Sequence, residues 1–344
     1  MTFVTLQALV LHEANRMGLE AVPSPVPESG GLTLRVEAAA ICGTDMRIYK
    51  GTKTRGVRLP CILGHEFSGV VEDAGATSFR SGQRVALCPA LPCGACRFCQ
   101  SGALNICEAL TAYGYELDGG FAELVKVPRA FVEAGHVIPL PDHVSFEEAA
   151  LAEPLACVIN GQSLMGLNAG EHVAVLGAGP IGILHVMLAK AKGAGRISVV
   201  QRSEARRKAA LALGADEAMG PEEAGRLKVD AAIVAIGSAD LANLAARIVR
   251  PRGRINLFAG FPVGELPRFD LNAVHYGEQF VSGAFGLTLA QFREALDLIA
   301  SGAVRVSQLV THRFPLSEAM EAFSAAQSGE ALKVMITPSS SSSS

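Results

Sequence analysis

Four cysteines lie within fifteen residues of one another in the sequence, at Cys93, Cys96, Cys99 and Cys107. Short spacings of this kind let successive thiolates surround one ion, and a structural zinc takes four tetrahedral ligands with no open position. The N-terminal residues lack a basic stretch followed by a long apolar run, so no secretory signal is expected and metal binding is favoured over disulfide pairing. We therefore predict a structural zinc site here.

A second set of possible ligands is dispersed along the chain. Cys42 lies in ICGTD, His65 and Glu66 lie together in GHEFSG, and Glu153 lies in AEPLA. One thiolate, one imidazole and two carboxylates suit zinc. Each residue alone has a simpler interpretation, since a single cysteine is usually a small core residue. The spacing by itself leaves open whether the four side chains converge.

The sequence Gly177-Ala178-Gly179-Pro180-Ile181-Gly182 matches the GxGxxG pattern of dinucleotide-binding proteins. It follows an apolar run typical of a strand and opens a run typical of a helix, which is the context that this pattern requires. The first glycine permits the tight turn, the second lets the backbone approach a pyrophosphate, and the third lets helix and strand pack closely. The N–H groups at the helix start then face the anion. These residues, Pro180 and Ile181 included, are predicted to bind a nicotinamide dinucleotide.

The end of the following strand should select between NAD and NADP. An acidic residue there would hold the ribose 2′-hydroxyl of NAD, but this sequence has Gln201, followed by Arg202, with Arg206 and Arg207 one turn later. Because no carboxylate repels a 2′-phosphate and a guanidinium can bind one through two hydrogen bonds, the pattern favours NADP. Glu204 could neutralise one arginine, and a solvated helix face is the simpler alternative.

The elements that must position these residues fall into two regions. Up to about residue 150, short apolar runs separated by Gly and Pro indicate an irregular β domain. From about residue 171, strands alternate with helices, which predicts a doubly wound parallel sheet. The expected strand–helix pairs are 172–179 with 180–194, 196–202 with 203–215, and 230–237 with 240–253, before a strand at 254–260. An amphipathic helix from Thr288 and a last strand, ALKVMIT, should return to the first region.

Composition excludes several classes of protein. Hydrophobic residues make up 49% of the chain and charged residues 18%, which is typical of a folded globular protein and not of a disordered one. A net charge of −3 offers no basic surface for nucleic acid, which argues against a zinc ribbon of the nucleic-acid-binding kind. No apolar run is long enough to cross a membrane, and a cytoplasmic enzyme is expected.

Taken in order, CGTD, GHEFSGVV, the four-cysteine segment, GGFAELVKVP, AEPLACV and VLGAGPIG resemble the zinc-containing medium-chain alcohol dehydrogenases over nearly the whole chain. The resemblance is greatest to the polyol branch, which includes sorbitol, L-iditol, butanediol and threonine dehydrogenases. It implies an α/β fold class, with a GroES-like β-barrel catalytic domain and a Rossmann domain. The implied boundaries are 1–152 with 288–338 for the catalytic domain, about 88–110 for its zinc lobe, 153–287 for the Rossmann domain, and 339–344 for a disordered serine tail.

The resemblance also implies roles for individual residues. Cys42 and His65 should be catalytic zinc ligands, Glu66 and Glu153 should bind that zinc directly or through water, and Thr44 should relay the substrate proton. The reacting centre should lie in the cleft between the domains. Beyond the glycine pattern, the backbone expected to line the nicotinamide pocket is that of Phe258, Ala259 and Gly260.

The expected reaction transfers a hydride between a secondary alcohol, such as a polyol, a sugar alcohol or a vicinal diol, and NAD(P), giving the ketone. Threonine and phosphorylated polyols remain alternative substrates. Residues 89–92 lack the histidine of threonine dehydrogenases, and Ile48 stands where the polyol branch has a tyrosine, with Tyr49 next to it, so the sequence departs from both groups and leaves the substrate open. A zinc-free quinone or enoyl reductase would lack Cys42 and His65, and a non-catalytic zinc protein would not need the glycine pattern. Relatives are homodimers or homotetramers, and an edge strand near Asn272–Gly286 is the expected contact.

Overall fold

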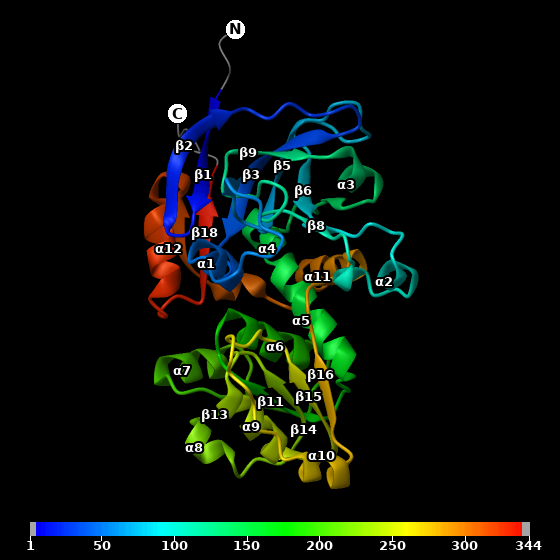
Figure 1. The fold of residues 1–344 in the computed structure, drawn as a ribbon, viewed down its shortest axis with the longest axis vertical. Helices are drawn as coiled ribbons and strands as arrows, with labels where there is room; N and C mark the ends of the chain where they lie inside the picture. Colours follow the sequence, from blue (N-terminus) through cyan, green and yellow to red (C-terminus); the bar gives the residue numbers. More distant parts are fainter. Residues whose placement is uncertain (1–4, 339–344) are drawn as a thin grey trace. The chain divides into compact units, whose positions relative to one another are not determined.

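The computed structural model describes residues 5–338 of the chain, so the serine tail lies outside the described residues. The chain divides into two compact units (Figure 1). Unit 1 comprises the described parts of Met1–Glu153, Leu287–Ser301 and Val306–Ser344, and unit 2 comprises Pro154–Gly286 and Gly302–Arg305. None of the described helices is long and apolar enough to cross a membrane.

Unit 1 is built mainly from two β-sheets. A three-stranded sheet has the order β2-β1-β4, and a seven-stranded sheet has the order β10-β6-β5-β3-β18-β17 with β9 also paired to β3. The strands are β1 (Thr5–Glu13), β2 (Arg16–Pro23), β3 (Leu32–Ala40), β4 (Cys61–Ile62), β5 (Glu66–Asp73), β6 (Arg84–Leu87), β9 (Leu124–Val127), β10 (Val137–Pro139), β17 (Val310–Pro315) and β18 (Lys333–Thr337). Their apolar faces enclose one core in which Phe67, Tyr113 and Phe131 meet edge to face. The last strand therefore does return to the first region, as the sequence predicts.

Short elements complete unit 1. The four-cysteine segment carries a two-stranded sheet and two single helical turns. These short elements are α1 (Gly43–Tyr49), β7 (Ala90–Leu91), α2 (Arg97–Gln100), η1 (Leu104–Ile106), β8 (Thr111–Ala112), α3 (Arg129–Glu133), α4 (Phe146–Ala150), α11 (Leu289–Ala300), η2 (Val306–Leu309), η3 (Leu316–Glu318) and α12 (Ala319–Gln327). Of the helices, α4 packs on β3 and β5, and α12 packs on β17 and β18. The helix predicted from Thr288 is confirmed, and Thr288 closes a capping box with Gln291 at its start.

Unit 2 is a parallel six-stranded sheet in the order β13-β12-β11-β14-β15-β16, as predicted for a doubly wound fold. Its strands are β11 (His172–Leu176), β12 (Arg196–Val200), β13 (Glu217–Met219), β14 (Val229–Val234), β15 (Val249–Leu257) and β16 (Phe280–Gly283). Its helices are α6 (Pro180–Ala191), α7 (Glu204–Ala212), α8 (Pro221–Ala224), α9 (Ala239–Ile248) and α10 (Leu271–Gly277), and α5 (Ala152–Met165) belongs to it from Pro154 onward. β11 and β14 lie at the centre and are buried on both faces.

Two predicted boundaries in unit 2 are wrong. The helix predicted for 240–253 ends at Ile248, and β15 begins at once with Val249, because Pro251 disfavours the helical conformation of the residue before it. The expected edge strand near Asn272–Gly286 is shorter than predicted, since Asn272 lies in α10 and only Phe280–Gly283 pairs with β15.

Candidate functional site

The structure brings Cys42, His65 and Glu66 together, with one possible ligand atom from each lying within 4.8 Å of the others. The register of the barrel explains this. Ala40 at the end of β3 pairs with Glu66 at the start of β5, so the residues that extend beyond this pair on each strand lie next to one another. Cys42 is partly exposed as the N-cap of α1, while His65 and Glu66 are buried.

Asp45 fixes the positions of Cys42 and His65, and its role was not predicted from the sequence. The buried Asp45 carboxylate accepts hydrogen bonds from the N–H groups of Cys42, at 2.9 Å, and Gly64, at 3.3 Å. Its Oδ1 also lies 3.3 Å from Nδ1 of His65. Burial lowers the pKa of His65, but the charges of Asp45 and Cys42 outweigh burial and hold that pKa well above its usual value. Carboxylate partners of this kind commonly orient metal-binding histidines.

Lys333 is the second residue that sequence reasoning missed. Its Nζ lies 2.8 Å from Oε1 and 2.5 Å from Oε2 of Glu66, and the two side chains are only 5% and 1% exposed. Burial lowers the pKa of Lys333, but Glu66 and then Cys42 raise it above its usual value, which favours the ammonium form of Lys333. The available signal was a lysine at the start of an otherwise apolar strand.

The group offers a donor set that fits zinc. It combines a thiolate, an imidazole and a carboxylate, and its two buried members, His65 and Glu66, each lie next to a charged side chain, Asp45 and Lys333 respectively. Glu153 is not one of the three residues, although its charge contributes to the raised pKa of Lys333. Thr44 adjoins the group, because its N–H donates to Sγ of Cys42 at 3.4 Å.

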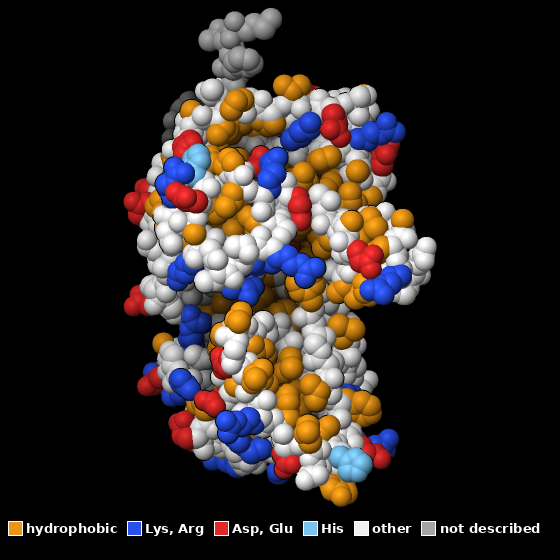
Figure 2. Space-filling model, in the orientation of Figure 1, with side chains coloured by type: hydrophobic (Ala, Val, Ile, Leu, Met, Phe, Trp, Pro, Cys, Tyr) orange, Lys and Arg blue, Asp and Glu red, His pale blue; other side chains and the backbone are white. Residues whose placement is uncertain are grey.

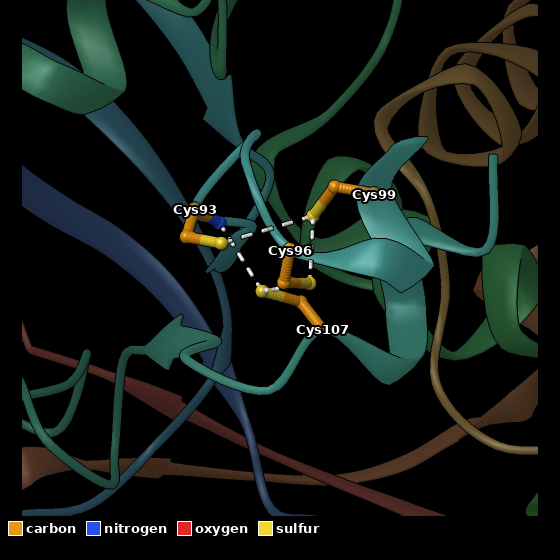
Figure 3. Close-up of side chains that lie close together, drawn as sticks. All are labelled: Cys93, Cys96, Cys99 and Cys107. Atoms are coloured by element: carbon orange, nitrogen blue, oxygen red, sulfur yellow. Dashed lines mark hydrogen bonds between the residues drawn. The ribbon is translucent and has the colours of Figure 1, made fainter. Parts of the chain in front are cut away.

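The four clustered cysteines converge in a second group (Figure 3). The Sγ–Sγ distances are 3.6 Å for Cys96–Cys99, 3.8 Å for Cys96–Cys107 and 4.0 Å for Cys93–Cys99. Four sulfurs at about 2.3 Å from a tetrahedral zinc lie about 3.8 Å apart, so the thiols are already spaced as zinc requires. Hydrogen bonds from the backbone N–H groups of Glu108 and Cys99 lower the pKa of Cys96 to about 6, which favours its thiolate.

The glycine pattern has the backbone geometry that a dinucleotide needs. Gly177 has a φ of +110°, a conformation that favours glycine. A Cβ on Gly182 would lie 1.9 Å from the carbonyl oxygen of Gly177, so only glycine fits there. Gly179 is the N-cap of α6, and Pro180 and Ile181 form the first turn. The N–H groups of that turn are therefore directed at the end of the sheet where β11 stops.

The residues predicted to select the cofactor surround this turn. The side-chain oxygen of Gln201 accepts a hydrogen bond from the N–H of Ala178, at 3.2 Å, and Arg206 donates to the carbonyl oxygen of Ala178, at 3.4 Å. Arg207 is engaged elsewhere, because it donates to the carbonyl oxygens of Gln201 and Arg202. The Arg202 side chain is exposed and makes no hydrogen bond or ion pair with any other residue of the described range 5–338.

Phe258, Ala259 and Gly260 follow β15 at the same end of the sheet. The N–H groups of Phe258 and Ala259 both donate to the carbonyl oxygen of Val234, which ends the neighbouring strand β14. The Phe258 ring packs edge to face on His185. The carboxyl ends of such strands are where open parallel sheets bind ligands.

Comparison with known proteins gives these sites a family. Residues 28–142 match the family model described as "Alcohol dehydrogenase GroES-like domain", and residues 180–301 match "Zinc-binding dehydrogenase". The chain is 33% identical to sorbitol dehydrogenase of Bombyx mori over 350 residues, which covers 96% of this chain and 97% of that protein. The chain belongs to the zinc-binding alcohol dehydrogenase family.

Solved structures agree with this assignment. A zinc-binding dehydrogenase from Sinorhizobium meliloti, bound to NADP, superposes with a TM-score of 0.91 at 31% identity, covering 97% of this chain and all of that one. The 2R,3R-butanediol dehydrogenase of Bacillus subtilis superposes with a TM-score of 0.87 at 26% identity, covering 97% and 100%. The predicted GroES-like and Rossmann fold class is confirmed. So is the predicted class of enzyme, a zinc-dependent alcohol or polyol dehydrogenase that uses a nicotinamide cofactor.

Proposed function

We propose that this dehydrogenase oxidises a secondary hydroxyl of a polyol, sugar alcohol or vicinal diol to the ketone at the Cys42, His65 and Glu66 group. The convergence of these three side chains, with possible ligand atoms within 4.8 Å of one another, is the observation that carries the proposal. The names of similar proteins support the substrate class, since sorbitol and 2R,3R-butanediol both carry adjacent hydroxyls.

In this proposal Cys42 and His65 hold the catalytic zinc, Glu66 binds it directly or through water, and Glu153 approaches it through water. When bound, zinc supplies a Lewis acid that lowers the pKa of the alcohol, and the nicotinamide accepts the hydride. Asp45 orients His65 and fixes the Cys42 backbone. Oγ1 of Thr44 accepts the hydroxyl proton and passes it toward solvent. Its position next to Cys42 supports that role.

The four-cysteine group has a separate role in the proposal. Cys93, Cys96, Cys99 and Cys107 hold a second, structural zinc with no open position. It closes the lobe that carries α2 and the η1 turn, where too few apolar residues are buried to fold the segment alone.

We propose NADP as the preferred cofactor. Gln201 brings no negative charge to the end of β12, and the exposed Arg202 with Arg206 can bind a 2′-phosphate. The NADP complex of the Sinorhizobium meliloti relative supports this choice, although an Escherichia coli relative was crystallised with NADH. Replacing both arginines by Ala should raise the KM for NADP about tenfold or more and leave the KM for NAD within about twofold. Equal effects on both cofactors would contradict the assignment.

We also propose a homodimer, or a homotetramer made from two such dimers, formed through the edge of the Rossmann sheet. β16 is an edge strand whose side chains Phe280 and Val281 are 62% and 44% exposed, and Phe285 beyond it is 63% exposed. Hydrophobic side chains gather over β16 and α10 in Figure 2. An open apolar edge is self-complementary about a twofold axis. In light scattering, Val281→Lys should have a smaller molar mass than the assembly formed by the native chain.

We propose the cytoplasm, or another reducing compartment, as the site of action. All eight cysteines are free thiols, and four of them are gathered as prospective metal ligands.

A direct assay tests the principal proposal. Purified protein is offered a panel of polyols, diols and L-threonine with NADP or NAD, and reduced cofactor is followed by absorbance. L-Threonine is included because the chain is 31% identical to an L-threonine 3-dehydrogenase of Bacillus licheniformis. Cys42→Ser should lose catalytic zinc and turnover together, while Cys61→Ser, a buried thiol outside both groups, keeps both. Retained zinc content with full turnover in Cys42→Ser would contradict the site.

A further inference from the structure

We infer that the alcohol substrate carries an anionic group, a carboxylate or a phosphate, bound by Arg47, Lys53 and Arg55 beside the zinc ligands. This inference rests on the proposed function and narrows its substrate class. Nothing in the reaction itself requires an anion, because a neutral polyol offers the same secondary hydroxyl.

The fold places these cations at the candidate site through one short helix and the loop after it. α1 starts directly after Cys42, and Arg47 in that helix donates from Nη2 to Oγ1 of Thr44 at 3.4 Å. The chain then folds back, because the N–H groups of Thr52 and Lys53 both donate to the carbonyl oxygen of Arg47, at 2.9 and 3.2 Å. Arg47 and Lys53 are therefore neighbours in space.

Lys53 also borders the group on its histidine side. Its Nζ lies 5.0 Å from the centre of the Tyr115 ring, and that ring lies 5.8 Å from the imidazole of His65. The Tyr115 phenol is largely buried, which together with nearby charges raises its pKa to about 12, so it stays a neutral hydrogen-bond donor. One cation thus lies at Thr44 and another at Tyr115.

These cations lack the partners that surface cations usually have. Within the described part of the chain, Arg47, Lys53 and Arg55 form no ion pair, whereas the nearby Arg58 lies 3.6 Å from Asp118. Burial, followed by the charges of Arg47 and Arg55, holds the pKa of Lys53 below its usual value. Lys and Arg side chains are visible on the face around α1 (Figures 1 and 2). A bound anion would relieve this repulsion.

Glu116 is an acidic residue whose charge acts on Lys53, and it is already engaged. Its charge raises the pKa of Lys53, but its Oε2 accepts a hydrogen bond from the N–H of Ala112 at 3.0 Å. Among the charges that act on Lys53, two arginines stand against this one carboxylate, so positive charge is in excess around Lys53. Two guanidinium groups and an ammonium form a set suited to carboxylate or phosphate oxygens.

Kinetics on matched substrates test the inference. Each polyol is offered in three forms, neutral, as its aldonate and as its terminal phosphate, for example sorbitol, gluconate and sorbitol 6-phosphate. We expect kcat/KM for one anionic form to exceed that of the neutral form by about tenfold or more, as one or two charged hydrogen bonds provide. The aldonate and phosphate arms identify which anion is bound. The preference should also weaken as salt rises from about 20 to 500 mM.

Variants locate the preference. Arg47→Gln and Lys53→Gln should each reduce the anionic-to-neutral ratio of kcat/KM about tenfold, and Arg16→Gln, an exposed cation on β2, should leave the ratio unchanged. A ratio insensitive to Arg47→Gln and Lys53→Gln would overturn the inference. So would variants that raise the KM for the cofactor instead, because the cations would then bind cofactor phosphates. Oxidation of neutral polyols without an anionic preference overturns only this inference, while no oxidation of any form by folded, zinc-loaded protein overturns the proposed function with it.

Discussion

The Lys333–Glu66 pair allows the most informative test of how the candidate site is built. Replacing Lys333 by Met keeps most of the side-chain volume and removes the ammonium. The Glu66 carboxylate is then buried, at 1% exposure, with the partner that lay 2.8 Å from its Oε1 removed. Breaking a buried pair by deleting one partner costs about 3–5 kcal/mol, because the remaining charge is uncompensated.

That loss should appear in thermal unfolding of unit 1. For a unit of roughly 200 residues, 1 kcal/mol lowers Tm by about 2–4 °C, so Lys333→Met should lower it by about 6–20 °C. The chain has no tryptophan, so far-ultraviolet circular dichroism follows the transition. The control is Arg16→Met, which breaks a pair whose side chains are both 65% exposed and should change stability by less than about 0.5 kcal/mol.

A double variant separates charge from packing. In Lys333→Met with Glu66→Gln, the uncompensated charge is gone, so stability should recover part of the loss seen in Lys333→Met alone. Two results would refute the reasoning. One is a Lys333→Met protein with the same Tm as Arg16→Met, which would mean that the buried pair contributes nothing to stability. The other is a double variant whose loss of stability equals the sum of the losses in the two single variants, which would mean that the two side chains act independently.

Three further predictions follow from the described geometry. Burial lowers the pKa of His185 to about 3 in the folded protein, whereas the pKa in the unfolded chain is near 6.5. As pH falls, the unfolded chain therefore binds a proton at this histidine first, and the native state loses stability between about pH 6.5 and about pH 3. We compare the free energy of unfolding of His185→Gln with that of the native chain by urea unfolding. From pH 7 to pH 5 the native chain should lose about 2 kcal/mol relative to the variant. An unchanged difference would contradict a buried neutral imidazole. Gly182→Ala, whose Cβ would lie 1.9 Å from the Gly177 oxygen, should weaken NADPH binding at least about tenfold by fluorescence titration, and Gly225→Ala, which meets no atom within 4 Å, should not. Cys96→Ser should reduce bound zinc from two ions to one per chain by metal analysis and lower Tm, and two retained ions would exclude the four-cysteine site.

The features that could be read from the sequence are those determined by near neighbours. The cysteine group spans one short segment, so its spacing alone predicts convergence. The glycine pattern works in the same way, because the turn, the backbone approach and the helix start lie within six residues. The parallel sheet followed from alternating apolar strands and helices. The boundary error at Val249 arose because an apolar helix end and an apolar strand start are adjacent with no turn between them.

What the sequence left open depends on pairing between distant strands. The convergence of Cys42 with His65 is a consequence of the Ala40–Glu66 register, and no local pattern specifies that register. Lys333 is 267 residues from Glu66 in the sequence, so its role could not be found from spacing. Asp45 is different, because it lies three residues after Cys42 within the CGTD motif. A capping-box pattern at the start of α1 was a signal that could have identified it.

These two supporting residues also show why the sequence could suggest the ligands and not their state. In the sequence, Glu66 is a carboxylate available to a metal. In the structure, the buried ammonium of Lys333 lies against this carboxylate and competes with a metal for the same oxygens. Asp45 does the reverse for His65, because it stabilises the imidazole orientation through Nδ1 while holding the Cys42 backbone. A ligand set is therefore a statement about residue types, but the strength with which each ligand binds is set by charges brought in from other strands.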